Sequence, residues 1–95
     1  MSARTQRLLE EELVGERASA LARTFEALER VLAELAGAAG PGQRLREFLL
    51  EEARERLWFL IVQREAIGLT RHEVVYETLR IPVEVRRAMG PRRRA

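Results

Sequence analysis

Residues 57–62 read LWFLIV, six consecutive apolar residues in a chain that elsewhere separates its apolar residues with charged ones. At about 100° per residue, six such side chains go round the full circumference of a helix, so one neighbouring helix cannot cover them all. A buried strand is the alternative, but helix-forming sequence without turn residues flanks the run on both sides. The run therefore predicts a helix buried on every side, with a second copy of the chain covering part of it. The predicted interface residues are Leu57, Trp58, Phe59, Leu60, Ile61 and Val62.

The sequence on either side of this run predicts a hairpin of two long helices. One helix spans residues 43–67, and Gly68 followed by Leu69 is typical of a Schellman motif at its end. Before the loop GAAGPG at 37–42, apolar residues repeat with heptad spacing and predict another helix over 3–36, capped by Ser2. The two interleaved heptad rows are Val14, Leu21, Leu28 and Leu35, and Ala18, Phe25 and Leu32.

The C-terminal third predicts two short helices and a tail. Thr70 and Glu73 have the spacing of a capping box and open a helix over 71–80. Pro82 disfavours a helical conformation at the residue before it and suits the first position of a helix over 82–89. A basic tail follows at 90–95. Residues 1–95 thus form one all-α domain, a long antiparallel hairpin followed by two short helices, which we expect to pair into a helical-bundle homodimer.

Composition narrows the class of protein further. The chain has 95 residues and no cysteine, 46% of its residues are hydrophobic and 34% are charged. These values are typical of a globular domain without disulfides, and no apolar stretch approaches the roughly 20 residues of a membrane span. No secretory signal is visible at the N-terminus. We therefore expect a cytoplasmic protein that does not insert into membranes.

Four polar residues follow the apolar run and are predicted to form a structural cluster, namely Gln63, Arg64, Glu65 and His72. At least one of the first three must point inward, and a buried charge has to be paired. His72 is the only histidine, and without cysteine or aspartate it lacks companions for catalysis or for metal binding. We expect no catalytic residues, no metal site and no cofactor.

The charge pattern leaves a second function open. All 17 basic residues are arginine, and residues 86–95 contain five of them without an acid. The segment 68–90 also has the outline of a helix-turn-helix, although Tyr76 and Arg80 occupy positions where that motif prefers small residues and glycine. The residues that would contact phosphates weakly are Arg86, Arg87, Arg92, Arg93 and Arg94.

The spacing W-x4-QRE-x2-GL-x2-H, from Trp58 to His72, resembles that of a family of small helical bacterial proteins grouped as a domain of unknown function. The resemblance covers roughly residues 8–90 and implies an all-α fold, but neither an activity nor a ligand. From the residues themselves, we expect a self-associating helical protein that acts as a structural or protein-interaction module. A small nucleic-acid-binding protein is the alternative, and an enzyme is disfavoured.

Overall fold

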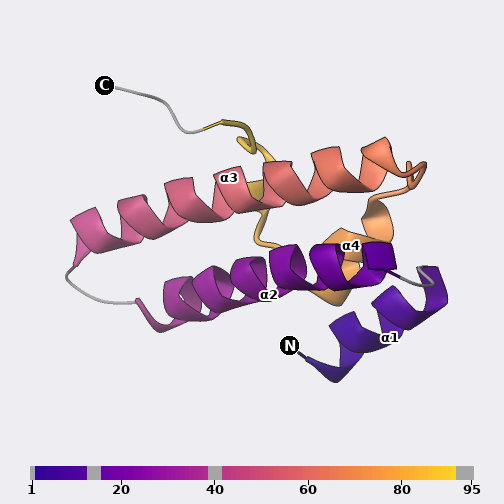
Figure 1. Ribbon diagram of the computed structural model, residues 1–95. Helices are drawn as coiled ribbons and strands as arrows, with labels where there is room; N and C mark the ends of the chain where they lie inside the picture. The colour runs from indigo at the N-terminus through magenta and orange to yellow at the C-terminus, as the bar shows by residue number, and fades with distance from the viewer. Residues whose placement is uncertain (1, 13–15, 39–41, 92–95) are drawn as a thin grey trace.

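The computed structural model describes residues 2–12, 16–38 and 42–91, and the regular structure in these ranges is entirely helical. The helices are α1 (Ala3–Glu12), α2 (Glu16–Gly37), α3 (Gln43–Ala66), α4 (Glu73–Thr78) and α5 (Val83–Arg86). The predicted all-α class is therefore confirmed. α2 and α3 are the longest helices and lie side by side in opposite directions (Figure 1). α4 and α5 are shorter than the helices predicted over 71–80 and 82–89.

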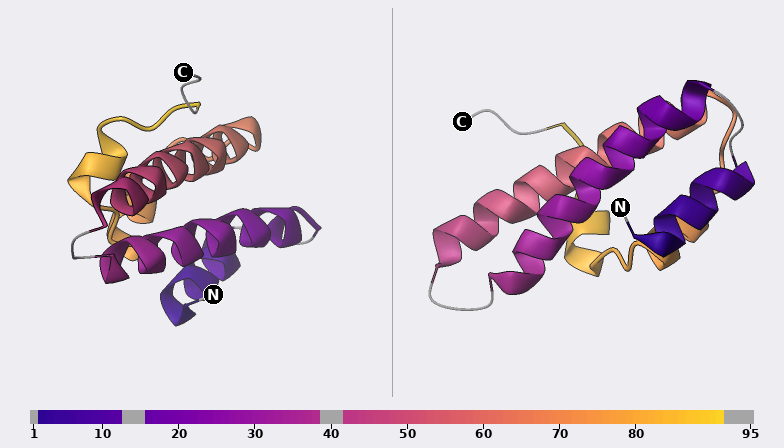
Figure 2. Two further views of the ribbon diagram at one scale, coloured as in Figure 1. Left: turned by 90° about the vertical axis from the view of Figure 1, so that its left-hand side faces the viewer. Right: turned by 60° about the horizontal axis from the view of Figure 1, so that its bottom comes forward.

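The N-terminal region differs from the single helix predicted over 3–36. α1 ends at Glu12, α2 begins at Glu16, and α1 folds back along α2 (Figures 1 and 2). The backbone N–H of Ser2 consequently donates to the Glu29 carboxylate at 3.1 Å, although one straight helix would hold these residues about 40 Å apart. The single-helix prediction was wrong. Its residues Val14 and Gly15 lie outside the described part of the chain.

Burial of apolar surface explains why the chain folds back. Leu8 and Leu9 in α1 are each only 5% exposed, whereas a helix continuing straight beyond α2 would leave them in water. Ser2 caps α1 as predicted, because its Oγ accepts a hydrogen bond from the N–H of Thr5 at 3.2 Å. The first helix therefore ends early so that its apolar residues can join the core.

The core lies between α2 and α3, and α1, α4 and α5 close it on one face of this pair (Figure 2). Two of the heptad residues of α2, Phe25 and Leu28, have no exposed surface and belong to this core. Val75 of α4 and Val85 of α5 are equally buried. The remaining members of the core are Leu8, Leu9, Leu21, Val31, Leu35, Leu49, Leu50, Ala53, Leu57, Leu60, Ile61 and Ile81.

Two helices end in the same type of turn. At the end of α3, Leu69 N–H donates to the Arg64 carbonyl at 2.9 Å and Gly68 has φ +90°, which is the predicted Schellman motif. At the end of α4, Ile81 N–H donates to the Tyr76 carbonyl at 3.0 Å and Arg80 has φ +51°. The predicted capping box of α4 does not form, because the N-cap residue is His72 and no side chain caps this helix.

Arg80→Gly is expected to stabilise the protein. Arginine occupies the left-handed conformation at a cost of about 1 kcal/mol that glycine does not have, although glycine also loses more backbone entropy on folding. We expect a net gain of about 0.5 kcal/mol, which corresponds to a melting temperature higher by roughly 2–4 °C. Thermal unfolding followed by circular dichroism measures this gain. A melting temperature lower by several degrees would show that the Arg80 side chain stabilises the turn instead.

Candidate interaction surface

The six residues predicted as an interface divide between the interior and the surface. Leu57 and Leu60 have no exposed surface and Ile61 is 7% exposed, so these three belong to the core of the chain itself. Phe59 and Val62 are 48% and 44% exposed. Trp58 is half-buried, and its ring centroid lies 5.2 Å from that of Phe59. Only part of the run is therefore available to a second molecule.

The exposed part continues along α3 beyond the predicted run. Leu45 and Phe48 are 56% and 52% exposed, and they lie on the same side of the helix as Phe59 and Val62. Alternating steps of three and four residues join these positions through Glu52 and Glu55, as in a heptad seam. We call the six residues the α3 row: Leu45, Phe48, Glu52, Glu55, Phe59 and Val62. The predicted interface was confined to residues 57–62 and did not include Leu45 and Phe48.

The α3 row lies opposite the side by which α3 joins the core. Leu57, Leu60 and Arg64 are buried and lie roughly 110–170° round the helix from the middle of the row. Of the large apolar side chains that are exposed in the described residues, four belong to the row and the fifth is Val83 of α5. The surface of the described chain thus concentrates its large apolar side chains on one helix face.

A hollow lies beside the row, between α2 and α3. It has a volume of about 370 Å³, and its lining residues are Arg56, Phe59 and Gln63 of α3 and Ala20, Arg23, Thr24 and Ala27 of α2. Glu52 of the row is ion-paired with Arg56 at 3.5 Å on the same surface. The exposed side of the helix pair therefore combines projecting aromatic and aliphatic side chains with a recess that can receive such a side chain.

The predicted polar cluster assembles where α3 meets α4, with one exception. The Arg64 side chain has no exposed surface, and it donates hydrogen bonds to the Arg71 carbonyl at 2.7 Å and to His72 Nδ1 at 3.4 Å. The other ring nitrogen, Nε2, lies 3.4 Å from the Glu65 carboxylate. Gln63 is exposed and lies in the hollow beside Phe59 instead. The contacts join the end of α3 to the start of α4, which is a structural role.

Two of the five arginines expected to contact phosphates lie in the described residues. The guanidinium of Arg86 lies 4.1 Å from the ring centroid of Tyr76, and Arg87 is exposed. Arg92, Arg93 and Arg94 lie outside the described residues. α5 has four residues, about one turn, which is short for a helix that reads a DNA groove.

Two other kinds of site are absent from the described residues. They contain no group of three or more side chains that could hold a metal ion. None of their helices combines the length and apolar character that crossing a membrane requires.

Comparison with known proteins identifies the family of the chain. The sequence model of a family of unknown function (DUF6665) matches residues 2–95, so the chain belongs to that family. This match confirms the family resemblance inferred from the sequence. The comparisons with curated proteins and with solved structures gave no match.

Proposed function

We propose that this member of a family of unknown function is a self-associating helical protein, a homodimer in which the α3 rows of two copies pack against each other. The observation that supports this proposal is the row itself, because four large apolar side chains are about half exposed on one face of the longest helix. Monomeric proteins seldom leave four large apolar side chains on one helix face in water, and helix pairs bury such faces as heptad seams.

The order of residues in the row favours a second copy as the partner. The row is symmetric in residue type about a point between Ala53 and Arg54. When two α3 helices pair in antiparallel fashion about that point, Leu45 lies opposite the partner's Val62, and Phe48 lies opposite the partner's Phe59. A two-fold interface brings the same patch of both copies together, and the symmetry of this row lets the apolar residues at each of its ends meet apolar residues of the partner. The recess beside Phe59 can receive a side chain of the partner.

The same pairing places Glu52 opposite the partner's Glu55 at the centre of the interface. Like charges facing each other destabilise helix pairing, so the aromatic contacts on either side have to outweigh this repulsion. Arg56 lies beside Glu52 and brings one positive charge per chain to the centre. We therefore expect a dimer of moderate affinity, which forms at micromolar concentrations rather than nanomolar ones.

Light scattering coupled to size exclusion tests the proposal. One copy has a mass of 10.9 kDa, and we expect a mass near twice that value at tens of micromolar protein. Phe59→Glu combined with Val62→Glu should return the mass to that of one copy, because burying charges in the seam weakens pairing by two orders of magnitude or more. Val83→Glu is the matched control, since Val83 is an exposed apolar residue outside the row. A single-copy mass for the unaltered protein would refute self-association.

Cross-linking tests the antiparallel register separately. The chain has no cysteine, so single cysteines can be introduced without a background. A mixture of the Phe48→Cys and Phe59→Cys proteins should be joined by a short bis-maleimide, whereas each protein alone should react little, because equal positions lie far apart in an antiparallel pair. Efficient cross-linking of Phe59→Cys alone would indicate a parallel pair. That result would overturn the register but leave self-association standing.

A further inference from the structure

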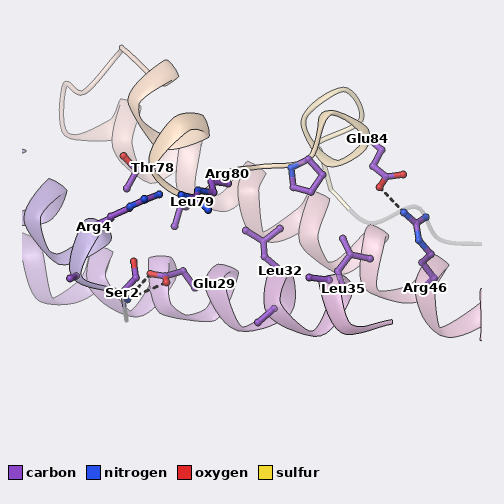
Figure 3. A pocket seen from close by; sticks show the side chains of 14 residues that line it. Ser2, Arg4, Glu29, Leu32, Leu35, Arg46, Thr78, Leu79, Arg80 and Glu84 are labelled. Atoms are coloured by element: carbon purple, nitrogen blue, oxygen red, sulfur yellow. Dashed lines mark hydrogen bonds and ion pairs between the residues drawn. The ribbon is translucent and has the colours of Figure 1, made fainter. Parts of the chain in front are cut away.

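A larger hollow lies on the opposite face of the α2–α3 pair, away from the α3 row. It is an open hollow lined mainly by α1, α2 and the turn between α4 and α5, and its volume is about 830 Å³ (Figure 3). Leu32 and Leu35 of α2 form part of its wall, together with Leu79 and Pro82 from the turn. The surface of the hollow is therefore apolar along α2 and the turn, and it is wide enough for a small organic molecule.

Two arginines bring positive charge to one end of this hollow. Arg4 projects from α1 and Arg80 from the turn, and their guanidinium groups point toward one another (Figure 3). Among the described residues, neither side chain has a hydrogen bond or an ion pair. Two facing cations without an acid between them provide a favourable position for an anion.

The two acidic residues of the hollow have partners other than Arg4 and Arg80. Glu29 accepts the hydrogen bond from the backbone N–H of Ser2, and Glu84 is ion-paired with Arg46 at 2.7 Å. The Arg46–Glu84 pair balances its own charge. The end of the hollow that holds Arg4 and Arg80 also contains Glu29, so its net charge is +1 (+2 − 1).

The backbone of Arg80 gives a second indication of a binding role. Its φ of +51° lies in the left-handed region, at the position of the helix-ending turn where glycine is preferred. Gly68 occupies the equivalent position at the end of α3. The chain thus places an arginine side chain at the rim of the hollow in a backbone conformation that is unfavourable for it. Such strained residues cluster at ligand sites.

We propose that this hollow binds a small amphipathic carboxylate, with its anionic head between Arg4 and Arg80 and its short acyl chain along Leu32 and Leu79. A carboxylate fits between two guanidinium groups because each of them can donate two parallel hydrogen bonds. The apolar wall beside the arginines accounts for the acyl chain, which a bare inorganic anion lacks. This site is independent of the proposed self-association, since it lies on the other face of the helix pair.

Titration calorimetry with octanoate, below its micellar concentration, tests the site in the full-length protein. We expect binding by the unaltered protein, and at least tenfold weaker binding by Arg80→Gly and by Arg4→Gln. Arg80→Gly is the decisive variant, because we expect it to fold at least as stably as the parent protein. Arg87→Gln, at an exposed arginine outside the hollow, should bind as the parent does.

Acetate and octyltrimethylammonium complete the test. Acetate should bind at least tenfold more weakly than octanoate if the acyl chain contacts the apolar wall, and the cationic amphiphile should not compete with octanoate. The proposal is overturned if the parent protein does not bind octanoate, if Arg80→Gly binds it as tightly as the parent, or if acetate binds equally well.

Discussion

Arg64→Ala is expected to lower the free energy of unfolding by about 3 kcal/mol, a large part of the stability of a domain of this size. The Arg64 side chain is completely buried, so its removal leaves a cavity between α3 and α4. The Arg71 carbonyl and His72 Nδ1 also lose the hydrogen bonds that Arg64 donates. A buried acceptor that loses its donor is destabilised beyond the value of the bond itself.

Chemical denaturation of the parent protein and of the Arg64→Ala and Gln63→Ala variants measures this change in the free energy of unfolding. Gln63 is the preceding residue but is exposed, so its replacement should change the free energy of unfolding by less than about 0.5 kcal/mol. Arg64→Met restores much of the volume but none of the hydrogen bonds, and it should fall between the two. Equal stability of the Arg64→Ala and Gln63→Ala proteins would mean that the buried guanidinium contributes nothing to holding α4 on α3.

The inward position of Arg64 follows from helix periodicity, although the sequence prediction stopped short of it. The prediction required one of three polar residues to point inward but did not choose among them. Leu57, Leu60 and Arg64 are spaced by three and four residues, so they share one face of α3. Once Leu57 and Leu60 are placed in the core, Arg64 must follow. The contact between Arg64 and Arg71, by contrast, depends on how the chain turns after Gly68, which periodicity does not determine.

The break between α1 and α2 could not be predicted from the heptad rows. The apolar spacing continues through Val14 and Ala18 without a change of phase, and a continuous helix satisfies it as well as two helices do. Tertiary packing distinguishes one continuous helix from two helices, because only folding back buries Leu8 and Leu9 against the rest of the chain. A glycine within a helical pattern is tolerated at a cost of about 1 kcal/mol, so Gly15 alone was not decisive.

The buried and exposed residues of the apolar run at 57–62 could not be told apart from the sequence alone. All six are apolar, and which of them α2 covers depends on the rotation of α3 about its axis. The rotation becomes clear only from the packing of the whole helix, in which Leu49 and Ala53 are also buried. The exposed positions then extend the row back to Leu45.

Leu57→Glu should therefore unfold the chain, whereas Phe59→Glu should leave it folded, although the two positions lie two residues apart in one apolar run. Leu57 has no exposed surface, so its replacement puts a carboxylate into the core and removes a buried leucine. We expect this to cost about 4 kcal/mol or more, which approaches the total stability of a small domain and leaves much of the protein unfolded at 37 °C. Phe59→Glu changes a side chain that is 48% exposed and should leave the fold of each copy intact.

Circular dichroism and light scattering, applied to both variants, separate these outcomes. Leu57→Glu should lose its cooperative thermal transition or melt at least 15 °C lower, at roughly 4–8 °C per kcal/mol for a domain of this length. Phe59→Glu should retain the helical spectrum and lose only the mass of the second copy. If Leu57→Glu instead remained fully folded and merely dissociated, Leu57 would belong to the interface and not to the core. α3 would then be rotated from the orientation that places Phe59 and Val62 at the surface.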